Sequence, residues 1–167
     1  IADETVEEDE PFYLELVGIQ NAQLNGPARA TGYVRNNDVT VDLLVPIPNQ
    51  GFVVKEGETV SVNIVTEGLT TAMINGLDVY VNSWTKPITT TPNLDHDHIP
   101  ETSPAVRRLT KQFPPPIKIS TVDDNQAEPK EYFFILIGVN DTKTSSEAQV
   151  SVDDEPVAGV QIVDNDA

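Results

Sequence analysis

Apolar and polar side chains alternate with a period of two along most of this chain, as they do in β-strands that have one face on a protein core. The clearest example is the segment 60–65, where Val60, Val62 and Ile64 occupy every second position. Other strands are predicted at 12–17, 28–35, 41–45, 52–54, 79–81, 117–120, 131–139, 148–152 and 157–163. Turn residues separate these strands at short intervals, so the predicted fold class is all-β, with the strands packed as a sandwich.

Residues 85–116 interrupt this pattern with an irregular, proline-rich insertion. Proline is tolerated in the first turn of a helix, so a short helix is expected to begin near Pro104. This helix would carry three basic residues, Arg107, Arg108 and Lys111. Two interpretations of the basic group remain open: a solvated face that reduces the surrounding negative charge, or a docking patch for an acidic neighbour.

The sequence contains an internal repeat. Residues 3–18 overlay residues 123–138 without a gap, and residues 32–38 match residues 160–166 at a spacing of 128. In both copies an acidic loop leads into an apolar strand, and a later strand ends in an acidic cluster. A repeat of this kind indicates two related structural units.

We therefore predict one complete module at 39–167, preceded at 1–38 by the C-terminal part of a second module. A lone β-hairpin is marginally stable in water, so the apolar residues of 1–38 require a partner. Two explanations remain open: the hairpin is the end of a module in a tandem array, or it is donated to a sandwich begun by a neighbouring subunit. Both explanations predict self-association with adjacent copies or modules.

Three acidic motifs follow one another in the complete module. They are a Glu-Gly step at 55–58, an acidic loop at 123–128 and a closing cluster at 164–166. In this order they resemble the Calx-β module, an immunoglobulin-like antiparallel β-sandwich that recurs in cell-surface and matrix proteins and in cation exchangers. The resemblance supports the fold class expected from the alternation of side chains and implies that loops cluster at one end of the sandwich.

The same resemblance implies that acidic side chains at this end bind Ca²⁺, which prefers carboxylate and carbonyl oxygens. In the complete module the implied ligands are Glu56, Asp123, Asp124, Glu128, Asp164 and Asp166, with Asp95 or Asp97 joining them. The partial module has Asp3, Glu4 and Asp38 for the same role. An alternative interpretation stays open, in which the acidic end is a solvated face that holds no ion.

Charge narrows the classes of partner. The formal net charge is −17, so nucleic acid and anionic membrane surfaces would repel the chain, whereas cations would be attracted. No apolar run approaches the length that spans a membrane. Neither nucleic-acid binding nor membrane insertion is expected.

The sequence gives little indication of catalysis. It has no cysteine, no glycine-flanked serine of the nucleophile-elbow type and no glycine-rich phosphate loop. One segment, Asp95-His96-Asp97-His98, resembles a metal-ligating string, because two imidazoles and a carboxylate can bind Zn²⁺. A histidine pair in a polar loop is more often solvated, so no catalytic residue is assigned and the protein is not expected to be an enzyme.

From these observations we expect a structural or adhesive module, extracellular or on the cell surface, that assembles end to end into rods and is stiffened by Ca²⁺. The alternative is a Ca²⁺-sensing regulatory module, as the resemblance to cation exchangers implies. A third interpretation is a metal-dependent hydrolase that uses the segment 95–98.

Overall fold

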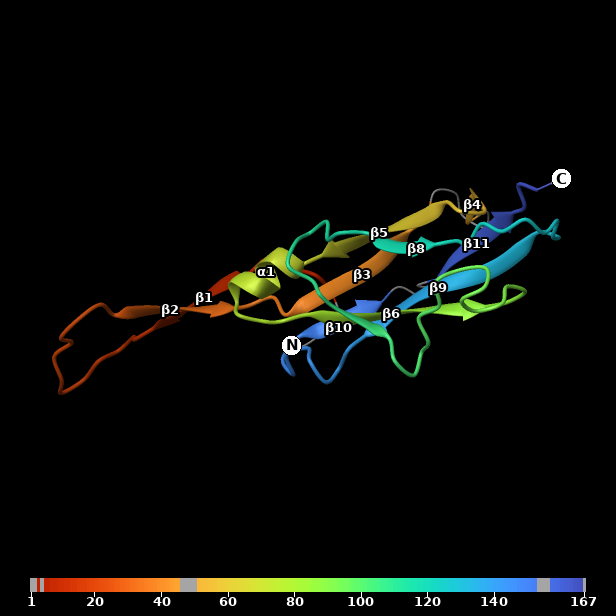
Figure 1. Cartoon of the computed structure of the whole chain (residues 1–167). Coiled ribbons are helices and arrows are strands. Elements are labelled where there is room, and N and C mark those ends of the chain that lie inside the picture. The colour runs from red at the N-terminus through yellow and green to blue at the C-terminus, as the bar shows by residue number, and fades with distance from the viewer. Residues whose placement is uncertain (1–2, 4, 46–50, 153–156, 167) are drawn as a thin grey trace.

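The computed structural model describes residues 3, 5–45, 51–152 and 157–166, which form an elongated molecule (Figure 1). The strands are β1 (Glu10–Glu15), β2 (Arg29–Val34), β3 (Asp38–Leu44), β4 (Phe52–Lys55), β5 (Thr59–Glu67), β6 (Tyr80–Pro87), β7 (Ala105–Arg108), β8 (Ile117–Ser120), β9 (Glu131–Val139), β10 (Gln149–Val152) and β11 (Val157–Val163). One short helix, α1 (Leu69–Ile74), follows β5. No helix in the described ranges is long and apolar enough to cross a membrane.

Nine of these strands form two sheets that pack as a sandwich. The four-stranded sheet has the order β10-β3-β5-β8, and the five-stranded sheet has the order β4-β11-β9-β6-β7. The predicted fold class is confirmed. Two pairs depart from the antiparallel expectation, because β10 pairs with β3, and β4 with β11, in parallel. The first strand of the sandwich is thus divided into β3 and β4, and the last into β10 and β11, with one part in each sheet.

The core lies between the inner faces of the two sheets. Val60, Val62 and Ile64 of β5 are buried, as the alternating pattern predicts. On the opposite sheet, β9 contributes Phe133 and Ile135, both 0% exposed. Complete burial of an aliphatic or aromatic side chain of this size stabilises the fold by about 1.5–3 kcal/mol. Because these buried side chains face each other across the core, the alternate side chains of β5 and β9 point away from it.

The predicted helix after Pro104 is wrong. Residues 105–108 form β7, which pairs with the edge of the five-stranded sheet through β6. Two partners keep the basic side chains in place: Arg107 donates to the Pro115 carbonyl at 2.6 Å, and Arg108 forms an ion pair with Asp78. An edge strand supplies backbone hydrogen bonds that outweigh the local preference for a helix. The helix that does form, α1, was not predicted.

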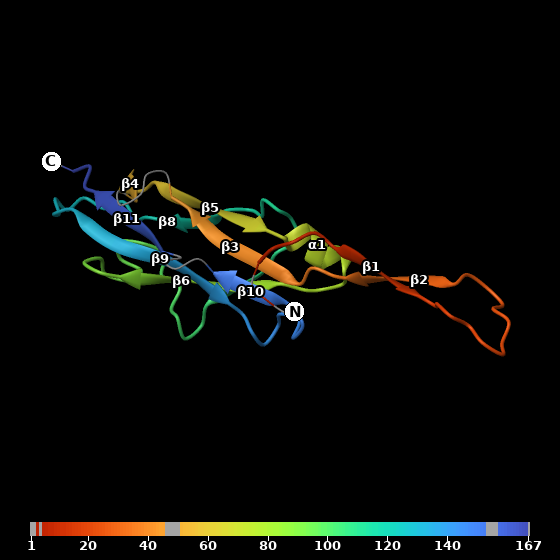
Figure 2. The same ribbon diagram turned by 180° about the vertical axis from the view of Figure 1, so that it is seen from behind.

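The remaining two strands form a separate hairpin. β1 and β2 pair antiparallel and project from one end of the sandwich, as both views show (Figures 1 and 2). Its two faces differ, because Phe12, Leu14 and Val34 lie on one side and Tyr13 and Arg29 on the other. The Arg29 guanidinium lies 3.6 Å from the centre of the Tyr13 ring. The hairpin is therefore ordered by its own cross-strand contacts and has a predominantly apolar face.

Asn75, at the end of α1, joins the hairpin to the sandwich. Its Nδ2 donates to Asp9 Oδ1 at 3.1 Å and to the Asn36 carbonyl at 3.2 Å, and its Oδ1 accepts from Arg35 Nη1 at 2.9 Å. Asp9 also accepts a hydrogen bond from the backbone of Asn36 at 2.8 Å. The bonds from Asn36 and then Asn75 lower the pKa of Asp9. A single side chain thus ties together both chain segments at the base of the hairpin.

Replacing Asn75 with alanine is expected to loosen the hairpin relative to the sandwich, because three side-chain hydrogen bonds are lost. The loss in free energy of unfolding should be about 1–2 kcal/mol. NMR relaxation of the β1 and β2 amides, together with urea unfolding, measures both effects. Asn75→Asp keeps the acceptor for Arg35 but places a second acceptor against Asp9 Oδ1 and the Asn36 carbonyl, so its effect should be at least as large. Equal relaxation in all three proteins would contradict the role of Asn75.

Candidate metal centre

Acidic residues from three loops meet at the end of the sandwich opposite the hairpin (Figure 1). Glu56 lies in the turn between β4 and β5, the segment 123–128 connects β8 to β9, and the segment 164–166 follows β11. Because β4 and β9 both flank β11 in the same sheet, the ends of these strands bring the loops together. The three motifs identified in the sequence are therefore adjacent in space.

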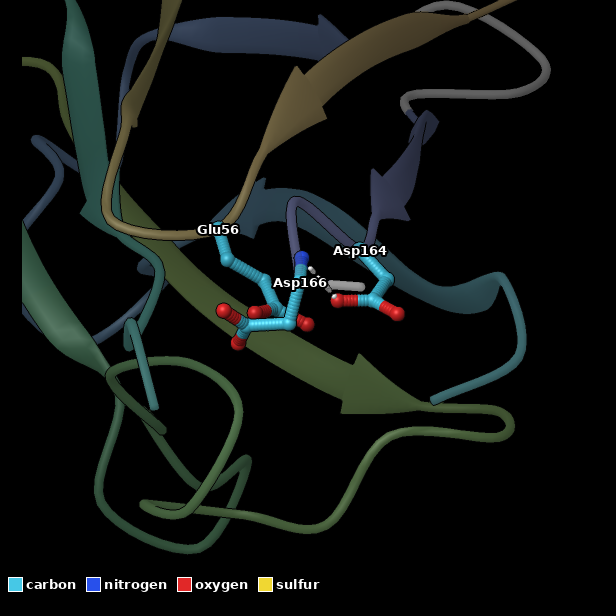
Figure 3. Close-up of side chains that lie close together, drawn as sticks. All are labelled: Glu56, Asp164 and Asp166. Carbon is cyan, nitrogen blue, oxygen red and sulfur yellow. Dashed lines mark hydrogen bonds between the residues drawn. The ribbon is translucent and has the colours of Figure 1, made fainter. Parts of the chain in front are cut away.

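The first group consists of Glu56, Asp164 and Asp166, whose carboxylate oxygens lie within 4.8 Å of one another. Figure 3 shows the three side chains converging. Asp164 is held in place because its Oδ1 accepts from the Asp166 backbone at 2.7 Å and its Oδ2 from the Glu128 backbone at 2.9 Å. By contrast, Glu56 Oε2 and Asp166 Oδ2 are buried and receive no hydrogen bond within the described part of the chain. Two buried acceptor atoms are thus left for a ligand.

Asn165 and Gly57 keep the loops at this distance. Asn165 Nδ2 donates to the Glu56 carbonyl at 3.2 Å and to Asp123 Oδ1 at 3.0 Å. Gly57 has a φ of +77°, and a Cβ at this position would lie 3.0 Å from the Cβ of Asp123. The Glu-Gly step therefore requires glycine for its left-handed turn and for the close approach of the acidic loop.

The second group consists of Asp95, Glu128 and Glu131, whose oxygens also lie within 4.8 Å of one another. Burial, followed by the charges of Asp95 and Glu128, raises the pKa of Glu131 to about 7. Burial and the charges of Asp95, Asp124 and Asp164 likewise raise the pKa of Glu128. The carboxylates repel one another, and a cation would relieve this repulsion.

The two groups are neighbours. Burial and the charges of Asp164, Asp124 and Glu128 raise the pKa of Glu56. Since Glu128 belongs to the second group, the two groups interact electrostatically. A small pocket is lined by members of both: Glu56, Asp95, Asp124, Glu128 and Glu131. The acidic end is therefore one continuous site that contains two neighbouring groups of carboxylates.

Glu131 was not among the ligands predicted from the sequence. It is the first residue of β9 and alternates with Phe133 and Ile135, so it lies on the core side of the strand. An acidic side chain at a position where the alternation predicts an apolar one is the signal that could have revealed it. Such a residue is costly to bury unless a cation or a proton neutralises it.

The other predicted ligands that the structure describes fall into three sets. Asp123 and Asp124 lie at the rim, where Asp123 accepts from Asn165 and Asp124 accepts from the Gln126 backbone at 2.6 Å. Asp97 is exposed and belongs to neither group. Asp3 and Asp38 lie at the base of the hairpin, at the other end of the sandwich. Glu4 lies outside the described residues.

The histidine string does not form a catalytic centre. His96 is 0% exposed, and its ring stacks on Phe133 at a centroid distance of 4.1 Å. Burial lowers the pKa of His96, so the ring is neutral. His98 makes a 2.9 Å hydrogen bond between its Nδ1 and Thr85 Oγ1. A ring packed into the core in this way is not accessible to a substrate.

The donor set indicates a class of metal. All the converging atoms are carboxylate oxygens, which hard cations such as Ca²⁺ and Mg²⁺ prefer, whereas Zn²⁺ and other transition metals favour nitrogen or sulfur. The carboxylates come from several separate loops and from the start of β9, and this suits the larger coordination number and irregular geometry of Ca²⁺ better than the strict octahedron of Mg²⁺. The residues present therefore fit Ca²⁺.

Comparison with known proteins supports the fold. No protein-family model matches the chain, and no curated protein matches it in sequence. Among solved structures, the chain is similar to the apo-form Calx CBD1 domain, with 19% identity and a TM-score of 0.55 over 77% of this chain and 98% of that domain. It is also similar to CBD12 from CALX1.2, with 20% identity, a TM-score of 0.53 and coverage of 76% of this chain and 46% of that one.

A third similar structure is the calcium binding domain CBD12 of CALX1.1, with 20% identity, a TM-score of 0.51 and coverage of 75% and 46%. This chain therefore spans less than half of the two CBD12 structures. The similarity confirms the expected Calx-β fold.

Proposed function

We propose that this chain is a Ca²⁺-binding module of the regulatory type, with its site at the acidic end formed by Glu56, Asp95, Glu128, Glu131, Asp164 and Asp166. The observation that carries the proposal is a pair of buried oxygens, Glu56 Oε2 and Asp166 Oδ2, that have no hydrogen-bond partner among the residues that the structure describes. A buried acceptor without a donor is costly, and a cation that binds both atoms removes the cost.

Electrostatics supports the same conclusion. Four of these carboxyl groups have raised pKa values, and in each case burial is the largest cause, followed by neighbouring acids. Without a cation the loops carrying them repel one another. Bound Ca²⁺ would neutralise this charge and draw together the turn at Glu56, the loop 123–128 and the segment 164–166, so binding is coupled to the order of three loops.

The regulatory interpretation is favoured over the adhesive one. One of the similar structures is described as a calcium binding domain. Coupling between an ion and three loops is the property that a sensor requires. End-to-end assembly and an extracellular location remain predictions from the sequence.

Isothermal titration of the chain with Ca²⁺, after removal of metal by a chelator, tests the proposal. We expect saturable binding by more than one ion, with an affinity in the sensor range of roughly 10⁻⁷–10⁻⁵ M rather than the weaker range of roughly 10⁻⁴–10⁻³ M. Mg²⁺ in a parallel titration should bind more weakly. An absence of Ca²⁺ binding at millimolar concentration would show that the acidic end is only a solvated face.

A further inference from the structure

The hairpin at the N-terminus reproduces the pairing of two strands of the sandwich. In the sandwich Phe133 is opposite Val160 and Ile135 is opposite Ala158, in the β9–β11 pair. In the hairpin Phe12 is opposite Gly32, at the matching positions. The remaining matching pairs are Leu14 with Ala30, and Glu10 with Val34, which corresponds to Glu131 with Ile162.

The loops at the ends of these strands match as well. Asn36 Oδ1 accepts from the Glu7 backbone at 3.1 Å, and its counterpart Asp164 accepts from the Glu128 backbone at 2.9 Å. Asn36 Oδ1 also accepts from the Asp38 backbone at 3.4 Å, as Asp164 does from Asp166 at 2.7 Å. The correspondence therefore extends from strand pairing to individual side chains.

The acidic loops complete the match and correct the sequence overlay. Asp3 accepts a hydrogen bond from the Thr5 backbone at 2.9 Å, as Asp124 does from the Gln126 backbone at 2.6 Å. Both the loop and the strand correspond at a spacing of 121 residues, not at the gap-free spacing of 120 expected from the sequence. The one-residue change moves Phe12 and Leu14 from the outward face to the core-facing positions.

The two copies differ in what covers them. Phe133 and Ile135 are 0% exposed and Ile162 is 2% exposed, because the four-stranded sheet packs on them. The corresponding side chains of the hairpin, Phe12, Leu14 and Val34, are 46%, 67% and 55% exposed. The same apolar pattern is thus buried in one copy and open to solvent in the other.

The edges of the hairpin are open as well. In the sandwich β9 lies between β11 and β6, and β11 lies between β9 and β4. Within the described ranges the hairpin consists of β1 and β2 alone, so each of these strands has one edge without a neighbouring strand there. By correspondence, the free edge of β1 suits an antiparallel strand like β6, and the free edge of β2 suits a parallel strand like β4.

We propose that the β1–β2 hairpin is an interaction surface for one kind of partner: a polypeptide segment that forms the counterparts of β3 to β8 and is completed by this hairpin into a second sandwich. The segment of this chain that plays that part in the sandwich is 39–122. It carries the partner strands and also Glu56 and Asp95, the only two members of the acidic groups with no counterpart among the described residues of the hairpin.

A complete second copy of the chain does not fit this role. In such a copy β9 and β11 already occupy the positions that the hairpin would take, and both of their edges are paired. The partner must therefore have the β6-like and β4-like edges free. This inference does not depend on Ca²⁺ binding, because it rests on the apolar face and the strand edges alone.

A fusion protein tests the proposal. Residues 39–122 are placed directly before Ala2, the residue that corresponds to Asp123 at a spacing of 121, and the rest of the chain follows unchanged. Hydrogen exchange is then measured by mass spectrometry on the peptides of β1 and β2, with Ca²⁺ and with chelator. We expect exchange of these amides to slow by about 100-fold or more relative to the original chain, because edges and face become covered.

Two variants of the fusion distinguish the faces of the hairpin. Leu14→Asp, on the face that would be buried, should return the β1 and β2 peptides to fast exchange. Tyr33→Asp, on the opposite face, introduces the same charge and should leave the protection in place. Equal effects of the two variants would overturn the assignment of the apolar face.

Two further outcomes would overturn the proposal itself. One is a fusion in which the β9 and β11 peptides are protected while the hairpin exchanges as fast as in the original chain. The other is the original chain forming a dimer in solution with its hairpin already protected, which would make a second copy the occupant. Hydrogen exchange of the fusion tests the first outcome, and light scattering of the original chain tests the second.

Discussion

Replacing Asp164 with asparagine is expected to weaken Ca²⁺ binding about 10- to 100-fold while leaving the loop structure intact. Asp164 does two things: it contributes charge to the first acidic group, and it accepts backbone hydrogen bonds from Asp166 and Glu128. The hairpin shows that asparagine can do the second, because Asn36 accepts the two corresponding bonds. Asp164→Asn therefore removes the charge and preserves the scaffold.

Titration calorimetry and urea unfolding of the metal-free protein separate these two contributions. Asp164→Ala loses the acceptors as well and should lower the free energy of unfolding by a further ~1–3 kcal/mol. Asp97→Asn is the matched control, because Asp97 is an exposed acid outside both groups and its replacement should leave the Ca²⁺ affinity unchanged. Unaltered Ca²⁺ affinity in Asp164→Asn would show that Asp164 is not a ligand.

In the absence of Ca²⁺, the free energy of unfolding is expected to fall as the pH rises from about 4.5 to about 7. The pKa of Glu131 is raised from 4.5 to about 7 in the folded protein, so the folded state holds this proton more tightly than the unfolded state. The stabilisation is fully present below 4.5 and is lost as the pH passes through about 7. The full difference corresponds to about 3 kcal/mol, and solvent screening reduces it to about 1–2 kcal/mol.

Ca²⁺ should reverse this trend, because it competes with the proton for the same oxygens. Its affinity should rise with pH up to about 7, and binding below that pH should release protons. Urea unfolding at a series of pH values, with Ca²⁺ and with chelator, measures both effects. Glu131→Gln should flatten the metal-free profile; an unchanged profile would place the titrating group elsewhere. Asp9 affects stability in a different pH range. Its pKa is lowered, so its contribution to the free energy of unfolding is lost only as the pH falls further into the acidic range.

The strands of the sandwich could be predicted from the sequence because their faces lie in contrasting environments. Alternation at 60–65 and 131–139 identifies β5 and β9, since one side of each faces the core. β7 could not be predicted in this way. It is a four-residue edge strand, mostly exposed, and its pairing with β6 depends on a neighbour distant in sequence.

The acidic site was predictable only in part. The first group lies in short motifs after strands, so the order of the strands is enough to bring Glu56 and Asp166 together. Glu131 belongs to a strand rather than a loop, and its role appears only when Asp95 is placed beside it. The register of the hairpin was also beyond sequence comparison, because a shift of one residue leaves the acidic pattern similar while it exchanges the two faces.

The parallel pairing of β3 with β10 has a mechanical consequence. β3 starts at the hairpin end of the molecule, whereas the chain leaves β11 at the acidic end (Figure 1). Tension between Asp38 and Asp166 would pull β3 and the β10–β11 segment in opposite directions along their length. The hydrogen bonds between β3 and β10 would then be loaded in shear and have to break together rather than one after another, which makes this pair the mechanical clamp of the sandwich.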